Sequence, residues 1–203
     1  MNIFTVFIVL VTMVILVSVN QFAGVHASGK PEQGKTALLI IDVQDFYFPG
    51  GGYALVNPEA AALNAAKLLK KFRGEKKLVI HVRHNAKSGA DIHETVKPLE
   101  GEKVISKDHA NSFRDTGLLK YLKENNVTRL VICGMMTHMC VEAATRAASD
   151  LGFKCIVVHD ACATRALTFG DRTVSAEDVH YSTLSALTSY AEVVDTETVL
   201  KGK

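Results

Sequence analysis

A carboxylate, an ammonium group and a thiol each follow a different apolar run of this sequence: Asp42 after "ALLII", Lys107 after "EKVIS", and Cys140 beyond "RLVIC". Because the carboxyl ends of parallel strands meet at one edge of a sheet, we expect these three side chains to converge. A carboxylate beside a thiol can accept its proton and create a nucleophilic thiolate, whose charge an ammonium group balances. The pattern therefore predicts nucleophilic catalysis by a cysteine.

The surroundings of Cys140 favour a reactive thiol. The segment that follows it, "VEAATRAASDLG", consists of strong helix formers and stops at Gly152, a residue type that often ends helices. Cys140 is thus expected at or near a helix N-terminus, where N–H groups and the helix dipole stabilise a thiolate. Structural roles are the alternatives: a buried thiol at 140, a loop-capping carboxylate at 42 and a solvated lysine at 107. Convergence on one rim favours catalysis.

Apolar runs of strand type alternate with helical patterns along the chain, and this alternation positions the three residues. The predicted strands are Ala37–Val43, Lys77–Arg83, Glu102–Lys107, Arg129–Cys133, Lys154–Ala161 and Ala191–Thr196. The predicted helices are Asn57–Gly74, Thr116–Asn126, the segment after Cys140, and Ser175–Tyr190. Such alternation predicts an α/β fold of three layers (α/β/α), in which a Rossmann-like, six-stranded, mostly parallel sheet carries helices on both faces.

The first residues are predicted to lie outside this domain. From Met1 to Gly29 there is no Asp, Glu, Lys or Arg, and Ile3–Val19 is almost uninterrupted apolar sequence. Small residues around Ala27 fit cleavage after it, which predicts a signal peptide over residues 1–27 and export, periplasmic or secreted. An uncleaved N-terminal membrane anchor and a misassigned start of the chain are the alternatives.

The remainder is predicted to be one folded unit. Residues 28–35 have the Pro, Gly and polar composition of a flexible linker, and residues 36–203 form the domain. Cys133 and Cys155 lie at the edges of apolar runs and are predicted to be buried thiols, with a disulfide between them as the alternative. Cys162 is expected in a loop.

Four motifs of the domain resemble those of the isochorismatase-like cysteine hydrolases, the superfamily of nicotinamidases and N-carbamoylsarcosine amidohydrolases. They are "LLIIDVQ" with Asp42, "ISKDHANSF" with Lys107, "VICGMMTHMCVEAATRAASDLGF" with Cys140, and "DACATR". The resemblance extends from about Lys35 to Val199. It implies that Cys140 is the nucleophile of a hydrolase, Asp42 its proton acceptor and Lys107 the balancing charge.

The resemblance also implies finer details of the site. The backbone N–H groups of Met136 and Cys140 correspond to the family's oxyanion hole, and the peptide bond Met135–Met136 to a non-proline cis bond. Nicotinamidases bind a metal through an Asp-x-His pair after the second strand, but the corresponding positions here hold His84 and Ala86. We therefore expect no metal and no other cofactor.

Side chains that line the substrate pocket are predicted from the loops that follow the strands. Family members usually read Asp-x-Gln-x-Asp-Phe at the end of the first strand, whereas this chain reads "DVQDFYFPGG", a shift that changes the wall of the pocket. A packing or surface role is the alternative for every candidate. The candidates are Gln44, Tyr47, His84, Phe113, Thr137 and His138.

The resemblance implies a reaction class. Isochorismatases that cleave a vinyl ether lack the cysteine, so Cys140 predicts hydrolysis of a C–N bond in a small amide, carbamoyl or ureido compound through a thioester. Vinyl-ether hydrolysis and an exported, non-catalytic binding protein on this fold are the alternatives.

Partners are limited by charge and by the family. A net charge of +2 with scattered signs excludes a nucleic-acid footprint. Membrane contact is expected only if the N-terminal segment is uncleaved. A homo-oligomer is expected from the family and from a face of small side chains on the helix after Cys140: Ala143, Ala144, Ala147 and Ala148.

Overall fold

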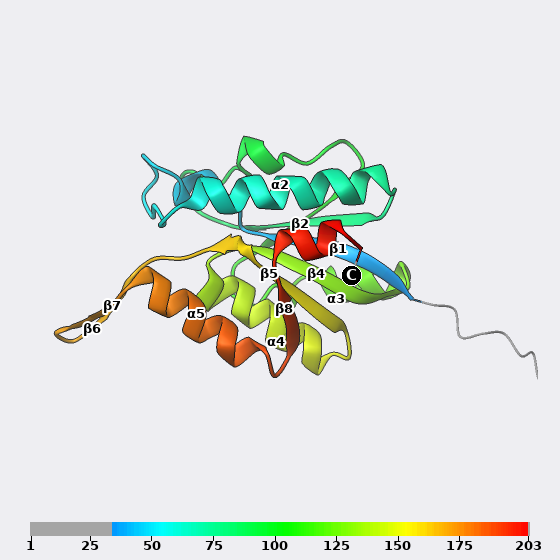
Figure 1. Ribbon diagram of the computed structural model, residues 1–203. Coiled ribbons are helices and arrows are strands. Elements are labelled where there is room, and N and C mark those ends of the chain that lie inside the picture. Colours follow the sequence, from blue (N-terminus) through cyan, green and yellow to red (C-terminus); the bar gives the residue numbers. More distant parts are fainter. Residues whose placement is uncertain (1–33, 203) are drawn as a thin grey trace, which may run out of the picture. The chain divides into compact units, whose positions relative to one another are not determined.

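The computed structural model describes residues 34–202, which belong to one compact unit built around a six-stranded parallel sheet (Figure 1). The strand order is β3-β2-β1-β4-β5-β8, and every neighbouring pair is parallel. The strands are β1 (Lys35–Ile41), β2 (Leu78–His84), β3 (Lys103–Lys107), β4 (Val127–Met135), β5 (Lys154–Ala163) and β8 (Ala191–Val194). This confirms the predicted fold class and all six predicted strands.

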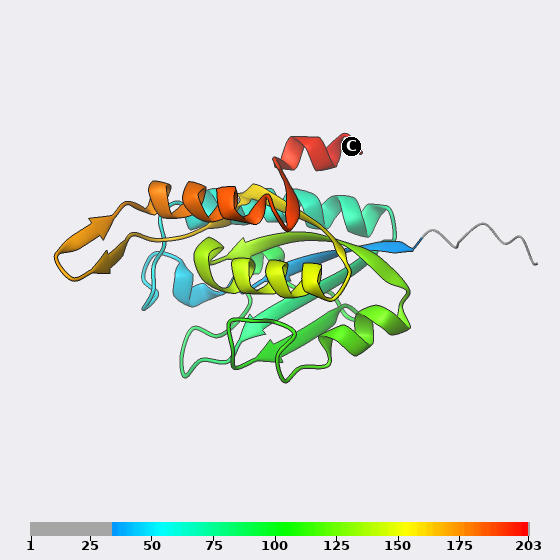
Figure 2. The ribbon, with the colours of Figure 1, turned by 90° about the horizontal axis from the view of Figure 1, so that it is seen from below.

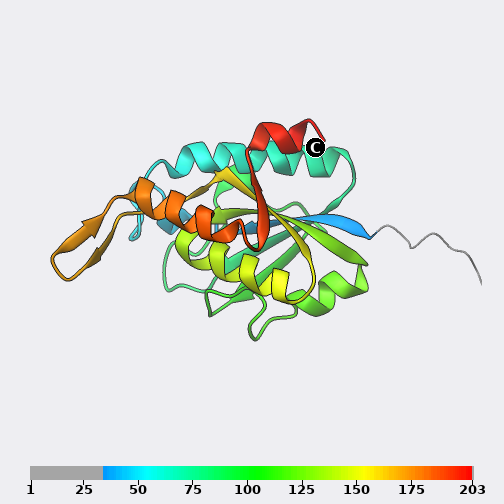
Figure 3. The ribbon, with the colours of Figure 1, turned by 60° about the horizontal axis from the view of Figure 1, so that its bottom comes forward.

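Helices cover both faces of the sheet, as predicted. Figures 1 and 3 show α2 and α6 on one face, and α3, α4 and α5 on the other. Their bounds are α2 (Pro58–Gly74), α3 (Leu118–Glu124), α4 (Glu142–Asp150), α5 (Ala176–Leu187) and α6 (Thr196–Leu200). The three-layer arrangement explains why β1 is a continuous apolar run: both of its faces are covered, and its residues from Ala37 to Ile41 are buried.

The structure corrects one local prediction and adds two elements that were not predicted. Cys162 lies in β5, not in a loop, because that strand continues two residues beyond the predicted end to Ala163. A hairpin of β6 (Leu167–Phe169) and β7 (Arg172–Val174) was not predicted, since its strands are three residues long and almost wholly exposed. Helix α6 was not predicted either; the Asp195 side chain begins it by accepting a hydrogen bond from the Thr198 N–H.

Gly134 allows β4 to approach the end of β1. It pairs with Ile41 in the parallel register and has a φ of +128°, in the region that favours glycine. A Cβ on residue 134 would collide with the Ile41 carbonyl. Glycine at this position therefore lets the last residue of β1, and with it Asp42, lie close beside the strand that leads to Cys140.

All four cysteines lie in the described part of the chain, and all are buried and free of disulfides. This confirms the interpretation of Cys133 and Cys155 as buried thiols. On α4, Ala144 and Ala148 are completely buried within the protein, so half of the predicted small-residue face packs internally. The homo-oligomer stays a prediction.

The predicted signal peptide, residues 1–27, and most of the predicted linker lie outside the described residues. The folded unit begins at Gly34, and β1 starts at Lys35. Within residues 34–202, the structure contains no helix that is both long and apolar enough to cross a membrane.

Candidate active site

The three residues predicted to act together meet in the interior, at the carboxyl ends of the strands. The Lys107 Nζ lies 2.7 Å from the Asp42 Oδ2, and both side chains are 0% exposed. The same Nζ donates a hydrogen bond to the Cys140 Sγ at 3.3 Å. One ammonium group thus contacts both the carboxylate and the sulfur, away from water.

Asp42 directly follows β1 and turns out of the strand. Its φ is +50°, in the left-handed region that Asp tolerates better than most residues, and its N–H donates to the Val82 carbonyl at 2.9 Å. The Asp42 Oδ1 is buried and accepts no hydrogen bond from the described residues. This oxygen therefore keeps its lone pairs for a proton.

Lys107 is the last residue of β3 and pairs in register with His84, the last residue of β2. Its carbonyl accepts a hydrogen bond from the Asn85 N–H at 2.9 Å, and its Nζ lies 3.4 Å from the His84 Nδ1. A buried ammonium group is unfavourable without a charge partner, and Asp42 supplies one. His84 thus borders the triad, and its predicted role in lining the substrate pocket stays a prediction.

Cys140 lies in a π-helical turn, Thr137–Val141 (η3), that connects β4 to α4. The turn follows a cis peptide bond at Met135–Met136, which the resemblance implied. The Thr137 hydroxyl lies 3.2 Å from the Ala163 carbonyl and 2.9 Å from the His180 Nδ1. Contacts to β5 and α5 therefore hold the turn that presents the sulfur.

The structure corrects the expectation of a resting thiolate. Cys140 does precede a helix, but burial raises the pKa of its thiol to about 12, and the negative charge of Asp42 adds to this against the opposing charge of Lys107. Burial also raises the pKa of the Asp42 carboxyl, although Lys107 opposes this shift. Burial thus opposes the stabilisation that a helix N-terminus gives to a thiolate, and it strengthens Asp42 as a base.

We expect alkylation of Cys140 by iodoacetamide to accelerate about tenfold per pH unit from pH 7 to 9.5 without levelling off, because only the thiolate reacts. Below a pKa of about 12 the thiolate is the minor form, and its share rises with pH. The measurement is the mass of the Cys140 peptide over time, with N-acetylcysteine as the unburied reference. A plateau below about pH 8 would show a stabilised thiolate and contradict this prediction.

The predicted pocket residues divide into two groups. Tyr47 and His138 lie near the triad: burial and then the charge of Cys140 raise the pKa of the Tyr47 phenol, and His138 lies in the same turn as Cys140. Gln44 does not face a substrate, because its amide bonds the backbone of His84 and Ala90 at 2.6 to 3.0 Å.

Two further candidates have structural roles. The Thr137 hydroxyl is engaged by the Ala163 carbonyl and by His180, so it fastens the turn and does not point at a ligand. The Phe113 ring stacks on Phe153, which precedes the first residue of β5 and lies toward the opposite end of the sheet. Phe113 is therefore not part of this site.

Sequence reasoning missed Arg165, His180 and Thr164. The charge of Arg165 lowers the pKa of both Tyr47 and His138, which places this exposed side chain close to the two of them. Thr164 Oγ1 bonds the His138 Nδ1 at 2.5 Å. Thr164 and Arg165 end the "DACATR" motif, a signal that was present, whereas nothing local marks His180.

His84 and Ala86 occupy the positions at which nicotinamidases carry their metal-binding pair, and they do not form such a pair here. His84 contacts Lys107, a cation, and Ala86 offers no ligand atom. Within residues 34–202 there is no group of three or more His, Cys, Asp or Glu side chains that could hold a metal ion. A buried carboxylate, ammonium group and thiol without a metal cluster can perform proton transfer and nucleophilic attack.

This fold and this set of side chains define an isochorismatase-like hydrolase domain. Residues 36–198 match the profile of the Isochorismatase domain, and the chain belongs to the isochorismatase family. It is 49% identical over 178 residues to the Bacillus subtilis uncharacterized isochorismatase family protein YddQ, covering 82% of this chain and 99% of that one. It is 32% identical over 189 residues to the Verticillium dahliae secreted isochorismatase effector Isc1, with shares of 88% and 95%.

A solved structure from Oleispira antarctica, of a chain assigned to the isochorismatase hydrolases, matches with a TM-score of 0.81 and 45% identity. The match covers 85% of this chain and all of that one. Two relatives carry names that state an activity. Streptomyces noursei streptothricin hydrolase is 36% identical over 63% of this chain and 49% of its own length. Pseudomonas putida maleamate amidohydrolase is 31% identical over 64% of this chain and 73% of its own length.

Proposed function

We propose that this protein hydrolyses a C–N bond in a small amide, carbamoyl or ureido compound through a thioester on Cys140. The observation that carries the proposal is the single buried ammonium group of Lys107, which contacts both the Asp42 carboxylate and the Cys140 sulfur. A charge in that position stabilises the ion pair that forms when the thiol proton moves to Asp42. Relatives named as a streptothricin hydrolase and an amidohydrolase support the reaction class.

In the first half-reaction, Asp42 takes the thiol proton while the Cys140 sulfur attacks the carbonyl carbon of the substrate. The backbone N–H groups of Met136 and Cys140 are proposed to stabilise the resulting oxyanion, a contribution of roughly 3–4 kcal/mol for each such donor. The C–N bond then breaks, and Asp42 returns the proton to the leaving nitrogen. The products of this half are the free amine or ammonia and a thioester.

In the second half-reaction, water attacks the thioester carbon while Asp42 takes one of its protons. The C–S bond breaks, the acid product leaves, and the proton on Asp42 returns to the Cys140 sulfur. The Lys107 ammonium group balances the negative charge on whichever neighbour carries it. The raised pKa of the Asp42 carboxyl makes it a stronger base for both transfers.

An assay of ammonia release from a panel of small amides, carbamoyl compounds and ureides tests the proposal. Each neutral substrate is paired with an analogue that carries a carboxylate, because Arg165 places a positive charge close to Tyr47 and His138. We expect turnover of at least one pair, with the lower KM for the carboxylate form. A panel without turnover, combined with tight binding of one member, would favour a binding protein on this fold.

Activity is expected to survive dialysis against a strong chelator, because His84 and Ala86 occupy the positions at which nicotinamidases bind their metal. The measurement is turnover before and after dialysis, together with elemental analysis of the protein for zinc, iron and manganese. Loss of activity that is restored by one equivalent of a metal would contradict this expectation.

We also propose that the chain is exported. The apolar run Ile3–Val19 without a charged residue supports this, as does the relative whose printed name describes it as secreted. We expect fractionation of cells that express the full chain, followed by N-terminal sequencing, to find a product that begins at Ser28 outside the cytoplasm. A cytoplasmic product that retains Met1 would contradict export, and a membrane-bound one would indicate an anchor.

A further inference from the structure

Basic side chains gather at the amino end of the sheet, opposite the end that carries Cys140. Five of the six strands have a basic residue within three positions of their start. These residues are Lys35 at β1, Lys77 before β2, Lys103 at β3, Arg129 in β4 and Lys154 at β5. The parallel register places Arg129 beside both Thr36 and Lys154, so three of them lie on adjacent strands.

The acidic residues at this end neutralise only part of the basic charge. Glu75 and Glu102 are held by their own partners: Lys71 and Lys77 for Glu75, Arg73 for Glu102. Glu100, Asp150 and Glu192 are exposed acids of the same end. Within residues 34–202, the basic side chains without an ion pair here are Lys35, Lys76, Lys103, Lys123, Arg129 and Lys154.

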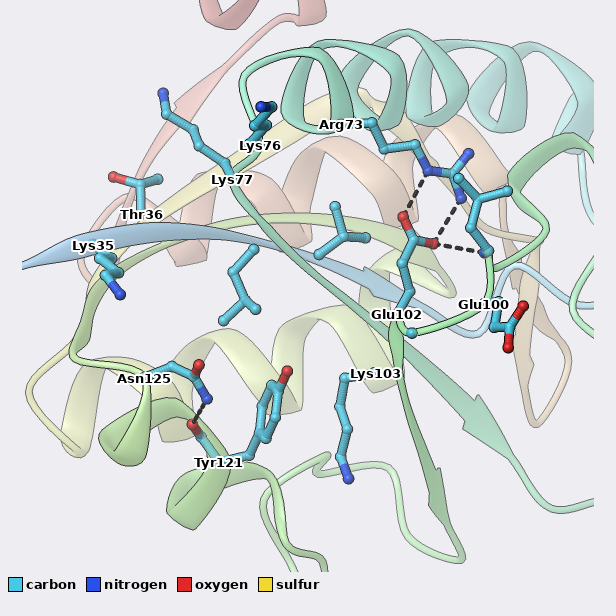
Figure 4. Close-up of a pocket in the computed structure, with 14 residues that line it drawn as sticks. Lys35, Thr36, Arg73, Lys76, Lys77, Glu100, Glu102, Lys103, Tyr121 and Asn125 are labelled. Atoms are coloured by element: carbon cyan, nitrogen blue, oxygen red, sulfur yellow. Dashed lines mark hydrogen bonds and ion pairs between the residues drawn. The ribbon is translucent and has the colours of Figure 1, made fainter.

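A cavity of about 690 Å³ opens beside three of these side chains, Lys35, Lys76 and Lys103 (Figure 4). Figure 4 shows Glu102 turned toward Arg73, whereas Lys35, Lys77 and Lys103 extend away from that pair. Apolar and aromatic residues also line the cavity: Leu99, which is 57% exposed, and Tyr121, over whose ring the Lys103 ammonium lies at 5.1 Å. Basic groups around an exposed leucine and a tyrosine suit the headgroup region of a lipid bilayer.

We propose that the amino end of this domain binds an anionic phospholipid surface. Basic clusters beside a membrane are attracted to anionic headgroups, and tyrosine is enriched at that depth. The N-terminal segment joins the domain at this same end, because Gly34 enters β1, a central strand of the sheet, from there; an uncleaved segment would add to the attachment, whereas the proposal rests on the basic surface alone. About 15 residues separate the apolar run Ile3–Val19 from that point, a reach of roughly 50 Å when extended.

This orientation is compatible with the hydrolase proposal but does not rest on it. The triad lies at the carboxyl ends of the strands, so a domain bound by its amino end would keep its active site toward the water. Figure 2 shows the start of β1 and the β6–β7 hairpin at opposite ends of the domain. The hairpin therefore lies far from the proposed lipid-binding surface, so substitutions there serve as controls.

Co-sedimentation of the chain that begins at Ser28 with lipid vesicles tests the proposal. That chain contains the complete compact unit from Gly34 onward. We expect binding to vesicles of phosphatidylcholine with 30% phosphatidylglycerol at low salt, loss of binding at about 0.5 M salt, and none to phosphatidylcholine alone. Failure to bind the anionic vesicles at low salt would overturn the proposal.

Two triple variants of equal charge locate the surface. Each basic residue near a membrane contributes about a fivefold gain in partitioning, so Lys35→Gln/Lys103→Gln/Lys154→Gln is expected to bind about 100-fold more weakly. The control variant Lys87→Gln/Arg165→Gln/Arg172→Gln removes three exposed charges from loops at the carboxyl end of the sheet and from the hairpin, and we expect vesicle binding to change by less than threefold. Equal losses in both variants would show a net-charge effect and overturn the assignment of this face.

A fluorescence probe reports orientation, because the chain contains no tryptophan. Leu99→Trp puts a single indole at the cavity, and Phe169→Trp puts one on the hairpin, where the native ring is 92% exposed. We expect anionic vesicles to shift the emission of the first to shorter wavelength and to leave the second unchanged. Equal shifts would contradict the orientation, and equally tight binding of duplex DNA through the same three residues would replace the lipid with a general polyanion.

Discussion

Replacing Cys140 with alanine is expected to lower turnover of the best amide substrate by a factor on the order of 10⁵ or more. Without the sulfur no thioester forms, and neither Asp42 nor Lys107 can attack a carbonyl in its place. Turnover is measured as ammonia release under saturating substrate, and stability as the thermal midpoint. The buried sulfur also contributes to packing, but the loss of one such atom costs about 1–2 kcal/mol and leaves the fold intact.

The matched control is Cys133→Ala. It removes the same atom from another buried cysteine, which lies within β4 and is 0% exposed. We expect a comparable fall in the thermal midpoint and turnover within a factor of about three of the original. Near-native turnover of the Cys140→Ala variant would show that the thiol mechanism is wrong, whereas equal loss in both variants would point to a folding defect.

Asp42→Asn is expected to reduce turnover by about 10³- to 10⁴-fold, because an amide cannot accept the thiol proton. Asparagine also tolerates the left-handed backbone that Asp42 adopts, with a φ of +50°, so the substitution preserves the local geometry. It leaves the Lys107 ammonium buried without its carboxylate, which costs roughly 3–5 kcal/mol of stability. The measurements are turnover and the free energy of unfolding in urea.

The double variant Asp42→Asn/Lys107→Met separates catalysis from stability. Removal of the stranded charge is expected to recover a large part of the unfolding free energy, since an apolar side chain suits the buried position. Turnover is expected to stay as low as in Asp42→Asn, because the base is still missing. Recovery of turnover together with stability would mean that Asp42 only supports the fold.

The sheet could be predicted from the sequence because each of its strands is a local apolar run. β1 illustrates this, since a strand covered on both faces must be apolar at consecutive positions. The β6–β7 hairpin carries no such pattern: its six strand residues are mostly exposed, so burial leaves no periodic trace. A Gly170–Asp171 pair between Phe169 and Arg172 was the available turn signal.

The members of the candidate triad could be predicted because each lies at the end of a strand or after it in the chain. The thiol's protonation could not, since it depends on burial and on a charge that approaches from another strand. The same limit applies to Gln44, whose amide is engaged by backbone atoms of the chain from His84 to Ala90. Contacts of this type join residues 40 or more positions apart, and no local pattern reveals them.

The anchorage of the Cys140 turn has a consequence for when the protein becomes active during its synthesis. Thr137 is held by Ala163 and His180, which are 26 and 43 positions further along the chain. A growing polypeptide therefore contains the complete triad before it contains the residues that hold the nucleophile in place. If the chain is exported before Ala163 and His180 are in place, the turn lacks its anchorage inside the producing cell, and the unfinished chain is expected to be inactive there.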